Sequence, residues 1–267
     1  MQSEGFRLRV MGIINVTPDS FSDGGVHFDR SVAVESALRM VEEGAAIIDI
    51  GGESTRPGAA PILIEEELER VIPVIEGIRA KSDVEISIDT RNAATARAAF
   101  AAGAGMLNDV SALQHDPEIL GVVAEANVPV VLMHMRGTPA TMQSLAKYDD
   151  VIDDVLRELA PSVERARSAG VEQVFIDPGI GFAKTFEHNL EILARCDELA
   201  RVAPFVIGAS RKKFIGHLTG REGRERVHGS LAAVAAAAAG GASIVRVHDV
   251  RETVDFLKVF RAIEAAG

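Results

Sequence analysis

The sequence has little aromatic, thiol or cationic character. Its 267 residues include one cysteine, one tyrosine and no tryptophan, and acidic side chains outnumber basic ones by 39 to 28. The lone cysteine, Cys196, excludes a disulfide within this chain and a metal site made of thiolates. A net charge of −11, with few rings on which bases could stack, argues against a nucleic acid partner.

Long hydrophobic runs are also missing. The apolar run Val10–Ile14 is too short for a secretory signal. The alanine-rich stretch Leu231–Val245 is interrupted by Gly240–Gly241 and is shorter than the roughly 20 residues that a membrane helix needs. At 47% hydrophobic residues, the chain nevertheless has enough apolar material for a packed core. We therefore expect a folded, soluble, cytoplasmic protein with no membrane partner.

Short apolar runs recur along the chain, and nearly all of the eight end on a polar residue. The runs end at Asn15, Gly52, Asp89, Asn108, His134, Asp177, Ser210 and Arg246–His248. These runs predict strands at 9–15, 47–51, 85–89, 105–108, 129–133, 173–177, 205–208 and 244–248. The segments between them predict helices at 31–43, 65–80, 92–102, 116–126, 148–169, 187–201, 225–239 and 251–265.

Strict alternation of strand and helix is typical of a parallel α/β sheet. The rival to a closed barrel is a doubly wound open sheet, but no GxGxxG follows the first strand. The length also matches the usual size of about 250 residues for a barrel. We expect one domain over residues 1–267, folded as an eight-stranded parallel (β/α)8 TIM barrel. In such a barrel the strand ends meet at one mouth, which carries the chemistry.

Three connections at that mouth are long. They are Val16–Arg30, Glu53–Ile64 and Ala209–Arg224, all rich in Gly, Pro, Ser, Thr, Asp and Arg. Loops of this length without secondary structure are usually functional. We expect all three to contribute to the site.

The last strand carries two cationic donors at its end. Arg246 and His248 are two residues apart, so their side chains are expected on the same face. Together with the basic segment Ser210–Lys213, they predict a site for an anion such as phosphate. The alternative is an arginine paired with a neighbouring carboxylate.

Acceptor groups end three other strands. Asp89, Asn108 and Asp177 suit a neutral heterocycle that presents several N–H donors. Each aspartate is open to another interpretation, as the cap of the following helix or as one of an acid and base pair. His134 is interpreted as a core histidine and is left out of the chemistry.

Metal ligands are sparse in the sequence. Asn15 suits Mg²⁺ only if a pyrophosphate supplies further oxygens, because magnesium usually takes one or two protein ligands. Arg56, beside the turn residues Pro57 and Gly58, is equally compatible with an anion clamp and with an exposed side chain. The residues alone thus indicate a barrel enzyme for a phosphorylated, polar heterocycle and leave the reaction type open.

At this point the motifs resemble a known family. Asn15–Gly25 is similar to the opening signature of the dihydropteroate synthases, and Gly51–Gly58 is similar to their second. Further matches follow in the expected order at Ile88–Thr90, Asn108–Val110, Met133–Gly137, Asp177–Phe182, Ser210–Lys212 and Arg246–Asp249. The resemblance covers nearly the whole chain.

The resemblance implies a reaction, a cofactor and roles for residues. The family joins 7,8-dihydropterin-6-ylmethyl diphosphate to p-aminobenzoate in folate biosynthesis, with Mg²⁺ and as a homodimer. Asn15, Arg56, Lys212, Arg246 and His248 would be catalytic, with Asn15 as the Mg²⁺ ligand. The substrate-binding set would be Thr55, Arg56, Pro57, Asp89, Asn108, Met133, Asp177, Phe182, Ser210, Lys212, Arg246 and His248.

Three positions depart from the family pattern. Ala183 stands where members often have glycine, Arg91 stands where an aromatic residue is common, and Lys213 stands where some members carry serine. Two other functions share the pterin pocket, namely a corrinoid methyltransferase domain and a paralogue that binds pterin without turnover. The intact motifs around Asn15, Arg56 and Arg246 favour the synthase.

Overall fold

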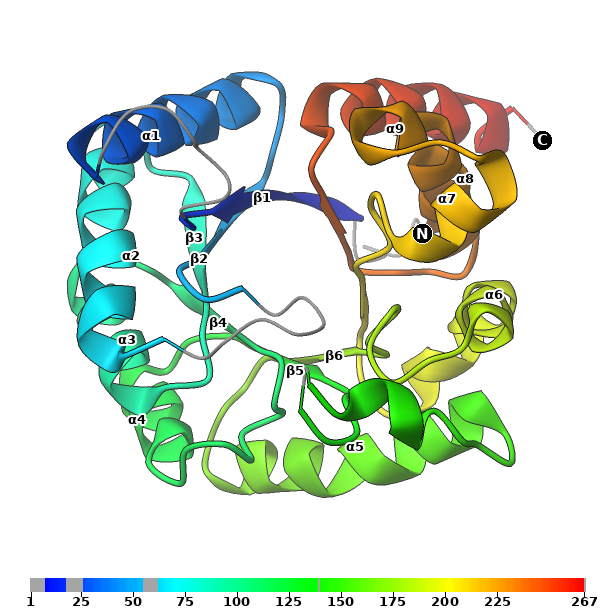
Figure 1. The fold of residues 1–267 in the computed structure, drawn as a ribbon, viewed down its shortest axis with the longest axis horizontal. Coiled ribbons are helices and arrows are strands. Elements are labelled where there is room, and N and C mark those ends of the chain that lie inside the picture. The colour runs from blue at the N-terminus through cyan, green and yellow to red at the C-terminus, as the bar shows by residue number, and fades with distance from the viewer. Residues whose placement is uncertain (1–7, 18–25, 55–61, 139, 267) are drawn as a thin grey trace.

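The computed structural model describes residues 8–17, 26–54, 62–138 and 140–266, and it contains a parallel sheet curved into a nearly closed barrel (Figure 1). The strands are β1 (Arg9–Asn15), β2 (Ile47–Gly51), β3 (Glu85–Asp89), β4 (Met106–Asp109), β5 (Val130–Met133), β6 (Val174–Asp177), β7 (Val206–Ile207) and β8 (Ile244–Val247). They form an eight-stranded sheet in the order β6-β5-β4-β3-β2-β1-β8-β7. Parallel pairing of Ile176 with Phe205 links β6 to β7. The predicted barrel is confirmed.

Helices surround the barrel on its outer side (Figure 1). They are α1 (Val26–Glu42), α2 (Ile64–Arg79), α3 (Ala93–Ala101), α4 (Ile119–Ala126), α5 (Val151–Ser168), α6 (Phe186–Ala194), α7 (Lys213–Thr219), α8 (Val227–Ala239) and α9 (Val250–Glu264). Short 3₁₀ segments are η2 (Met142–Leu145), η3 (Cys196–Arg201) and η4 (Gly223–Arg226). No helix within the described ranges is long and apolar enough to cross a membrane.

Two segments expected to be loops are partly helical, so those expectations were wrong in part. Helix α1 begins at Val26, inside the expected loop Val16–Arg30, whose residues 18–25 lie outside the described ranges. The two apolar residues of its first turn, Val26 and Phe28, are two positions apart, which is not a helical spacing. Helix α7 lies inside Ala209–Arg224, and its seven residues are too few to give a helical period.

Several helix boundaries differ from those expected from the sequence. Asp150 caps α5, because its carboxylate accepts hydrogen bonds from the N–H groups of Ile152 and Asp153. The helix expected from residue 116 begins at Ile119 instead. The Asp116 carboxylate accepts from the N–H of Ala93 at 2.8 Å, and thus caps the neighbouring helix α3. The helix expected at 187–201 is divided at Arg195 into α6 and η3.

The interior of the barrel has an apolar layer below a polar one. The apolar layer consists of Met11, Ile47, Met106, Val131, Phe175, Val206 and Ile244. Side chains alternate along a strand, so the residue two positions further on faces the same interior. On four strands that residue is polar, namely Asp49, Asn108, Asp177 and Arg246. The strand period therefore places the chemistry just above the apolar floor, toward the mouth.

Candidate active site

A pocket opens at the carboxyl ends of the strands. Its lining is Asp89, Asn108, Val110, Met133, Asp177, Ile180, Phe182, Gly208, Lys212 and Arg246. The sequence-predicted residues Asp89, Asn108, Met133, Asp177, Phe182, Lys212 and Arg246 thus lie in one cavity, although they come from different strands and loops.

Arg246 lies between two carboxylates in this pocket. Its Nε donates to Asp49 Oδ2 at 2.6 Å, and its Nη2 donates to Asp89 Oδ2 at 2.7 Å. Burial opposes the charge of Arg246, but Asp49 and Asp89 hold its pKa above the ordinary arginine value. The alternative weighed from sequence, a paired arginine, is therefore what the structure contains, and a role toward a diphosphate stays a prediction.

Asp49 is a site residue that the sequence interpretation missed. It is fully buried at 0% exposure, and its Oδ2 also accepts from Asn108 Nδ2 at 3.1 Å. Its Oδ1 has no hydrogen-bond partner among the described residues. Asp49 thus orients both Arg246 and Asn108. The signal in the sequence was a lone acid inside the apolar run from Ile47 to Ile50.

The aspartates that end β3 and β6 do not cap helices. Asn92 and Thr185 are the N-cap residues of α3 and α6. Asp177 Oδ1 accepts from the N–H of Gly179 at 2.7 Å, which leaves Oδ2 beside Gly208, where a Cβ would lie 3.5 Å from it. Burial raises the pKa of Asp177, and the Gly179 N–H and Lys212 oppose the rise. Burial likewise raises the pKa of Asp89 against the effect of the Arg246 guanidinium.

Asn108 presents an acceptor to the pocket. Its amide nitrogen is used by Asp49, so its carbonyl oxygen is the group left for a ligand. Together, Asp89, Asn108 and Asp177 offer oxygens to a molecule that brings N–H donors. This pattern agrees with the chemistry expected from the strand ends.

Lys212 and Phe182 form another side of the pocket. The Lys212 ammonium lies 4.4 Å from the centre of the Phe182 ring, a cation–π contact. Burial lowers the pKa of Lys212 to about 8, and Asp177 opposes that fall. Phe182 packs in an apolar cluster with Val110, Met133, Met142 and Ala183. The wall is therefore apolar, with one cation at its edge.

His248 and Ser210 are not among the residues that line this pocket. The Ser210 hydroxyl is 3.1 Å from His248 Nδ1, and the His248 backbone N–H donates to the same oxygen at 3.2 Å. His248 lines a second cavity, with Arg211 and Asp249, because β8 ends at Val247 and the strand alternation stops before His248. Burial and the neighbouring Arg211 lower the pKa of His248 to about 3, so it is neutral at pH 7. The expected pair of cations on one face is thus a single cation.

The remaining predicted residues are Asn15 and the segment 55–57. Asn15 ends β1, is half-buried, and its side chain has no hydrogen-bond partner among the described residues. Thr55, Arg56 and Pro57 lie outside the described ranges, so their roles stay predictions.

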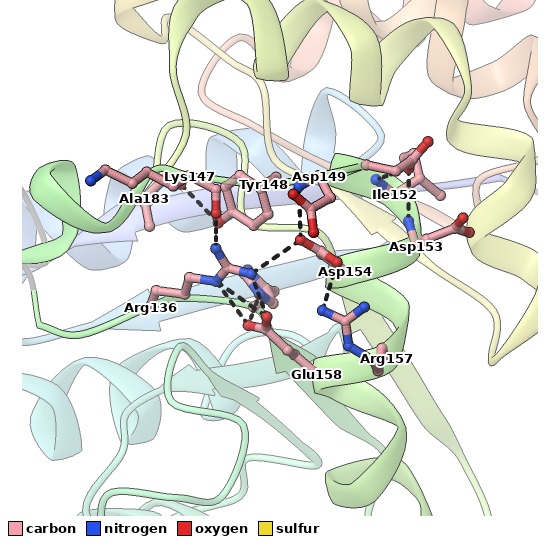
Figure 2. A network of polar contacts seen from close by, with 12 residues as sticks. Arg136, Lys147, Tyr148, Asp149, Ile152, Asp153, Asp154, Arg157, Glu158 and Ala183 are labelled. Carbon is pink, nitrogen blue, oxygen red and sulfur yellow. Dashed lines mark hydrogen bonds and ion pairs between the residues drawn. The ribbon is translucent and has the colours of Figure 1, made fainter.

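A polar network beside the pocket was not anticipated. Arg136 follows β5, contacts Glu158 of α5, and lies 3.9 Å from the centre of the Tyr148 ring (Figure 2). His134 is 3% exposed, with Nε2 at 2.9 Å from Glu158 and Nδ1 at 3.0 Å from Lys184. The interpretation of His134 as a core histidine is confirmed. The partners are too far apart in sequence for a motif to reveal them.

The three residues that depart from the family pattern have different structural settings. Ala183 has φ +47°, a left-handed conformation that glycine adopts without strain. Arg91 donates from two nitrogens to the two oxygens of Glu53, at 2.9 and 3.1 Å, and so stabilises the end of β2. Lys213 is the exposed first residue of α7.

The chain is similar to known proteins over nearly its whole length. Residues 11–248 match the family model described as pterin binding enzyme. The dihydropteroate synthase of Synechocystis is 49% identical over 97% of this chain and 91% of its own length. That of Escherichia coli is 48% identical over 96% and 92%.

Solved structures give the same result. The Xanthomonas albilineans dihydropteroate synthase with 4-aminobenzoic acid has a TM-score of 0.91 and 51% identity, covering 97% of this chain and 94% of its own. A structure of the X. albilineans enzyme with 7,8-dihydropteroate has a TM-score of 0.88 and 48% identity, with coverage of 97% and 94%.

Proposed function

Because the chain belongs to the family of pterin-binding enzymes, we propose how its barrel mouth performs the dihydropteroate synthase reaction. It condenses 7,8-dihydropterin-6-ylmethyl diphosphate with p-aminobenzoate to give 7,8-dihydropteroate and pyrophosphate in folate biosynthesis. The observation that carries the assignment of residues is one pocket, with carboxylate and amide acceptors on one side and Lys212 with Phe182 on another.

The pterin ring is bound by the acceptors of the pocket. Asp177 Oδ2 and the Asn108 carbonyl oxygen accept from N–H groups of the ring, and Lys212 donates to a ring oxygen or nitrogen. Asp177 Oδ1 remains on the Gly179 N–H at 2.7 Å, so ligand binding does not release the turn. Asp89 faces the ring while it pairs with Arg246 at 2.7 Å. These groups make the pocket complementary to a flat heterocycle with several donors.

Asn15, Arg56, Arg246 and His248 act on the diphosphate. A single amide oxygen fits Mg²⁺ when the substrate provides oxygens, and the Asn15 side chain has no other partner among the described residues. When bound, Mg²⁺ neutralises charge on the leaving group. Arg246 binds Asp49 and Asp89 through Nε and Nη2, and its other N–H groups donate to the diphosphate. His248, neutral at pH 7, donates a hydrogen bond rather than a charge.

The aminobenzoate ring packs against Phe182. That side chain is 9% exposed and belongs to an apolar cluster, which suits a benzene ring. Ser210 and the start of α7 supply polar groups for the carboxylate of the substrate, and Thr55, Arg56 and Pro57 are further predicted contacts. The amine of p-aminobenzoate is thereby directed toward the methylene carbon of the pterin.

The reaction breaks the bond from that methylene carbon to the diphosphate oxygen and forms a bond to the arylamine nitrogen. Positive charge develops on the methylene and is spread over the electron-rich pterin, which Asp89 and Asp177 face. The arylamine is neutral at pH 7 and loses its proton after attack. A strong general base is therefore unnecessary, in agreement with the acceptor and donor roles of the pocket.

The test is a condensation assay with purified protein. Pyrophosphate and dihydropteroate should appear in equal amounts, and only with both substrates and Mg²⁺ present. Pyrophosphate release without aminobenzoate, or methyl transfer to a corrinoid, would refute the assignment. Pterin binding without any turnover would identify a binding paralogue.

We also propose that the protein is a cytoplasmic homodimer. Each subunit would consist of one domain over residues 1–267. Two exposed apolar side chains on α9, Val259 at 62% and Ile263 at 68%, support a subunit contact. Light scattering of the purified protein should give twice the 28.4 kDa chain mass, and a monomer would contradict the proposal.

A further inference from the structure

The turn that joins β6 to α6 carries Phe182 into the pocket. Left-handed residues alternate along it, with φ +71° at Gly179, +82° at Gly181 and +47° at Ala183. Such a path forms no repeating ladder of backbone hydrogen bonds. Its shape therefore depends on side chains that bind its backbone groups.

Lys184 is the side chain that reaches the backbone of Phe182. Its Nζ donates to the Phe182 carbonyl oxygen at 3.0 Å and lies 3.0 Å from His134 Nδ1, at the end of β5. Lys184 is only 3% exposed. A second bond to the same turn comes from the Tyr148 hydroxyl, which donates to the Ala183 carbonyl at 2.8 Å (Figure 2). The Tyr148 bond and the contact of Lys184 with His134 connect this wall of the pocket to the neighbouring β5 unit.

His134, the partner of Lys184, is held in one tautomer. The Glu158 carboxylate accepts only, so His134 Nε2 must carry the proton that it donates to Glu158 at 2.9 Å. His134 Nδ1 then has a lone pair directed at the Lys184 ammonium. Arg136 also binds Glu158, with its Nε donating to both carboxylate oxygens at 3.2 and 3.1 Å (Figure 2). The hydrogen bonds thus run in one direction, from Lys184 through His134 to Glu158 on α5.

We propose that Lys184 is a positioning residue for the aminobenzoate substrate, because it fixes the Phe182 carbonyl and thereby the Phe182 ring as a wall of the pocket. This inference rests on the proposed function, in which aminobenzoate packs on Phe182.

The pterin side of the same turn is held mainly by groups other than Lys184. Asp177, five positions before Phe182 along the turn, accepts a hydrogen bond from the Gly179 N–H at 2.7 Å. Lys212 and Arg246 also lower the pKa of Asp177 more strongly than Lys184 does. Removal of Lys184 should therefore change aminobenzoate binding and leave pterin binding nearly constant. A residue with only a general structural role would change both.

The test compares Lys184→Met with Lys184→Gln, which keeps an N–H donor, and with Lys258→Met on the exposed face of α9. KM for aminobenzoate is measured at saturating pterin diphosphate and Mg²⁺, and pterin affinity is measured separately by calorimetry. Lys184→Met should raise KM for aminobenzoate about tenfold, the size of one lost buried hydrogen bond, and change pterin affinity less than about threefold. Lys184→Gln should fall between Lys184→Met and the wild type, and Lys258→Met should match the wild type.

Each outcome decides the proposal. Equal losses in pterin affinity and in KM for aminobenzoate, or no loss in either, would overturn it. If Lys184→Met does not fold, Tyr148→Phe removes only the hydroxyl bond to the Ala183 carbonyl, and it should raise KM for aminobenzoate in the same selective way. An unchanged KM in Tyr148→Phe would then overturn the proposal. An inactive wild-type protein in the same assay would refute the proposed function instead.

Discussion

Replacement of Asp177 by asparagine tests the acceptor chemistry of the pocket most sharply. Asp177 Oδ1 accepts from the Gly179 N–H at 2.7 Å, so asparagine must keep its carbonyl oxygen there and turn its NH₂ group toward the ligand. A donor then faces a donor of the pterin ring. Because burial raises the pKa of Asp177, loss of its charge also removes an unfavourable contribution to folding. The variant should therefore remain folded.

The magnitude follows from one mismatched buried hydrogen bond. A buried donor that faces another donor weakens binding by about 1.4–2.8 kcal/mol, which corresponds to about a 10- to 100-fold weaker pterin affinity. Calorimetric titration of a pterin into Asp177→Asn measures the loss directly. Asp255→Asn makes the same chemical change on α9, where the side chain is 66% exposed, and should bind pterin as the wild type does. Unchanged affinity in Asp177→Asn, with a melting temperature equal to the wild type, would refute the reasoning.

Three further predictions concern Arg246, Glu158 and the order of binding. Arg246→Ala leaves Asp49 and Asp89 without their cation, so denaturant titration should show unfolding easier by about 3 kcal/mol; a stability equal to the wild type would show that the ion pairs contribute nothing. The hydrogen bond from His134, together with Arg136, lowers the pKa of Glu158 from 4.5 to about 2, so its stabilising effect is complete above pH 4.5 and is lost as the pH falls toward 2. Glu158→Gln should therefore flatten the acid side of the melting temperature profile, and an unchanged profile would contradict the assigned contacts. Aminobenzoate should bind more tightly when pyrophosphate and Mg²⁺ are present, and by linkage it should tighten pyrophosphate by the same factor; equal affinities in the two calorimetric titrations would exclude this coupling.

Much of the fold was predictable because the sequence shows two clear patterns, namely short apolar runs typical of strands and helical spacing in the segments between them. Apolar runs that end on Asn15, Asp89, Asn108 and Asp177 mark strand ends, and a parallel barrel brings such ends to one mouth. Helix α7 was missed because its seven residues bury only Phe214 and Ile215, which gives no readable period.

The site was predictable where a side chain ends a strand and less so where its role depends on a distant partner. Asp49 lies inside the run that forms β2, and its partners Asn108 and Arg246 are 59 and 197 residues away. Sequence spacing placed Arg246 and His248 on one face, but β8 ends between them. The hydrogen-bond series from Lys184 through His134 to Glu158 joins the loop after β6, the end of β5 and helix α5. Only the folded structure brings these three segments together.

The central claim is that the pocket between β3, β4 and β6 holds the pterin ring, and a crystal structure of the enzyme with a bound pterin tests it most directly. The ring is predicted to lie against Asp89, Asn108 and Asp177, with Lys212 and Phe182 beside it. A ring found instead in the second cavity, next to Arg211 and His248, would contradict the account.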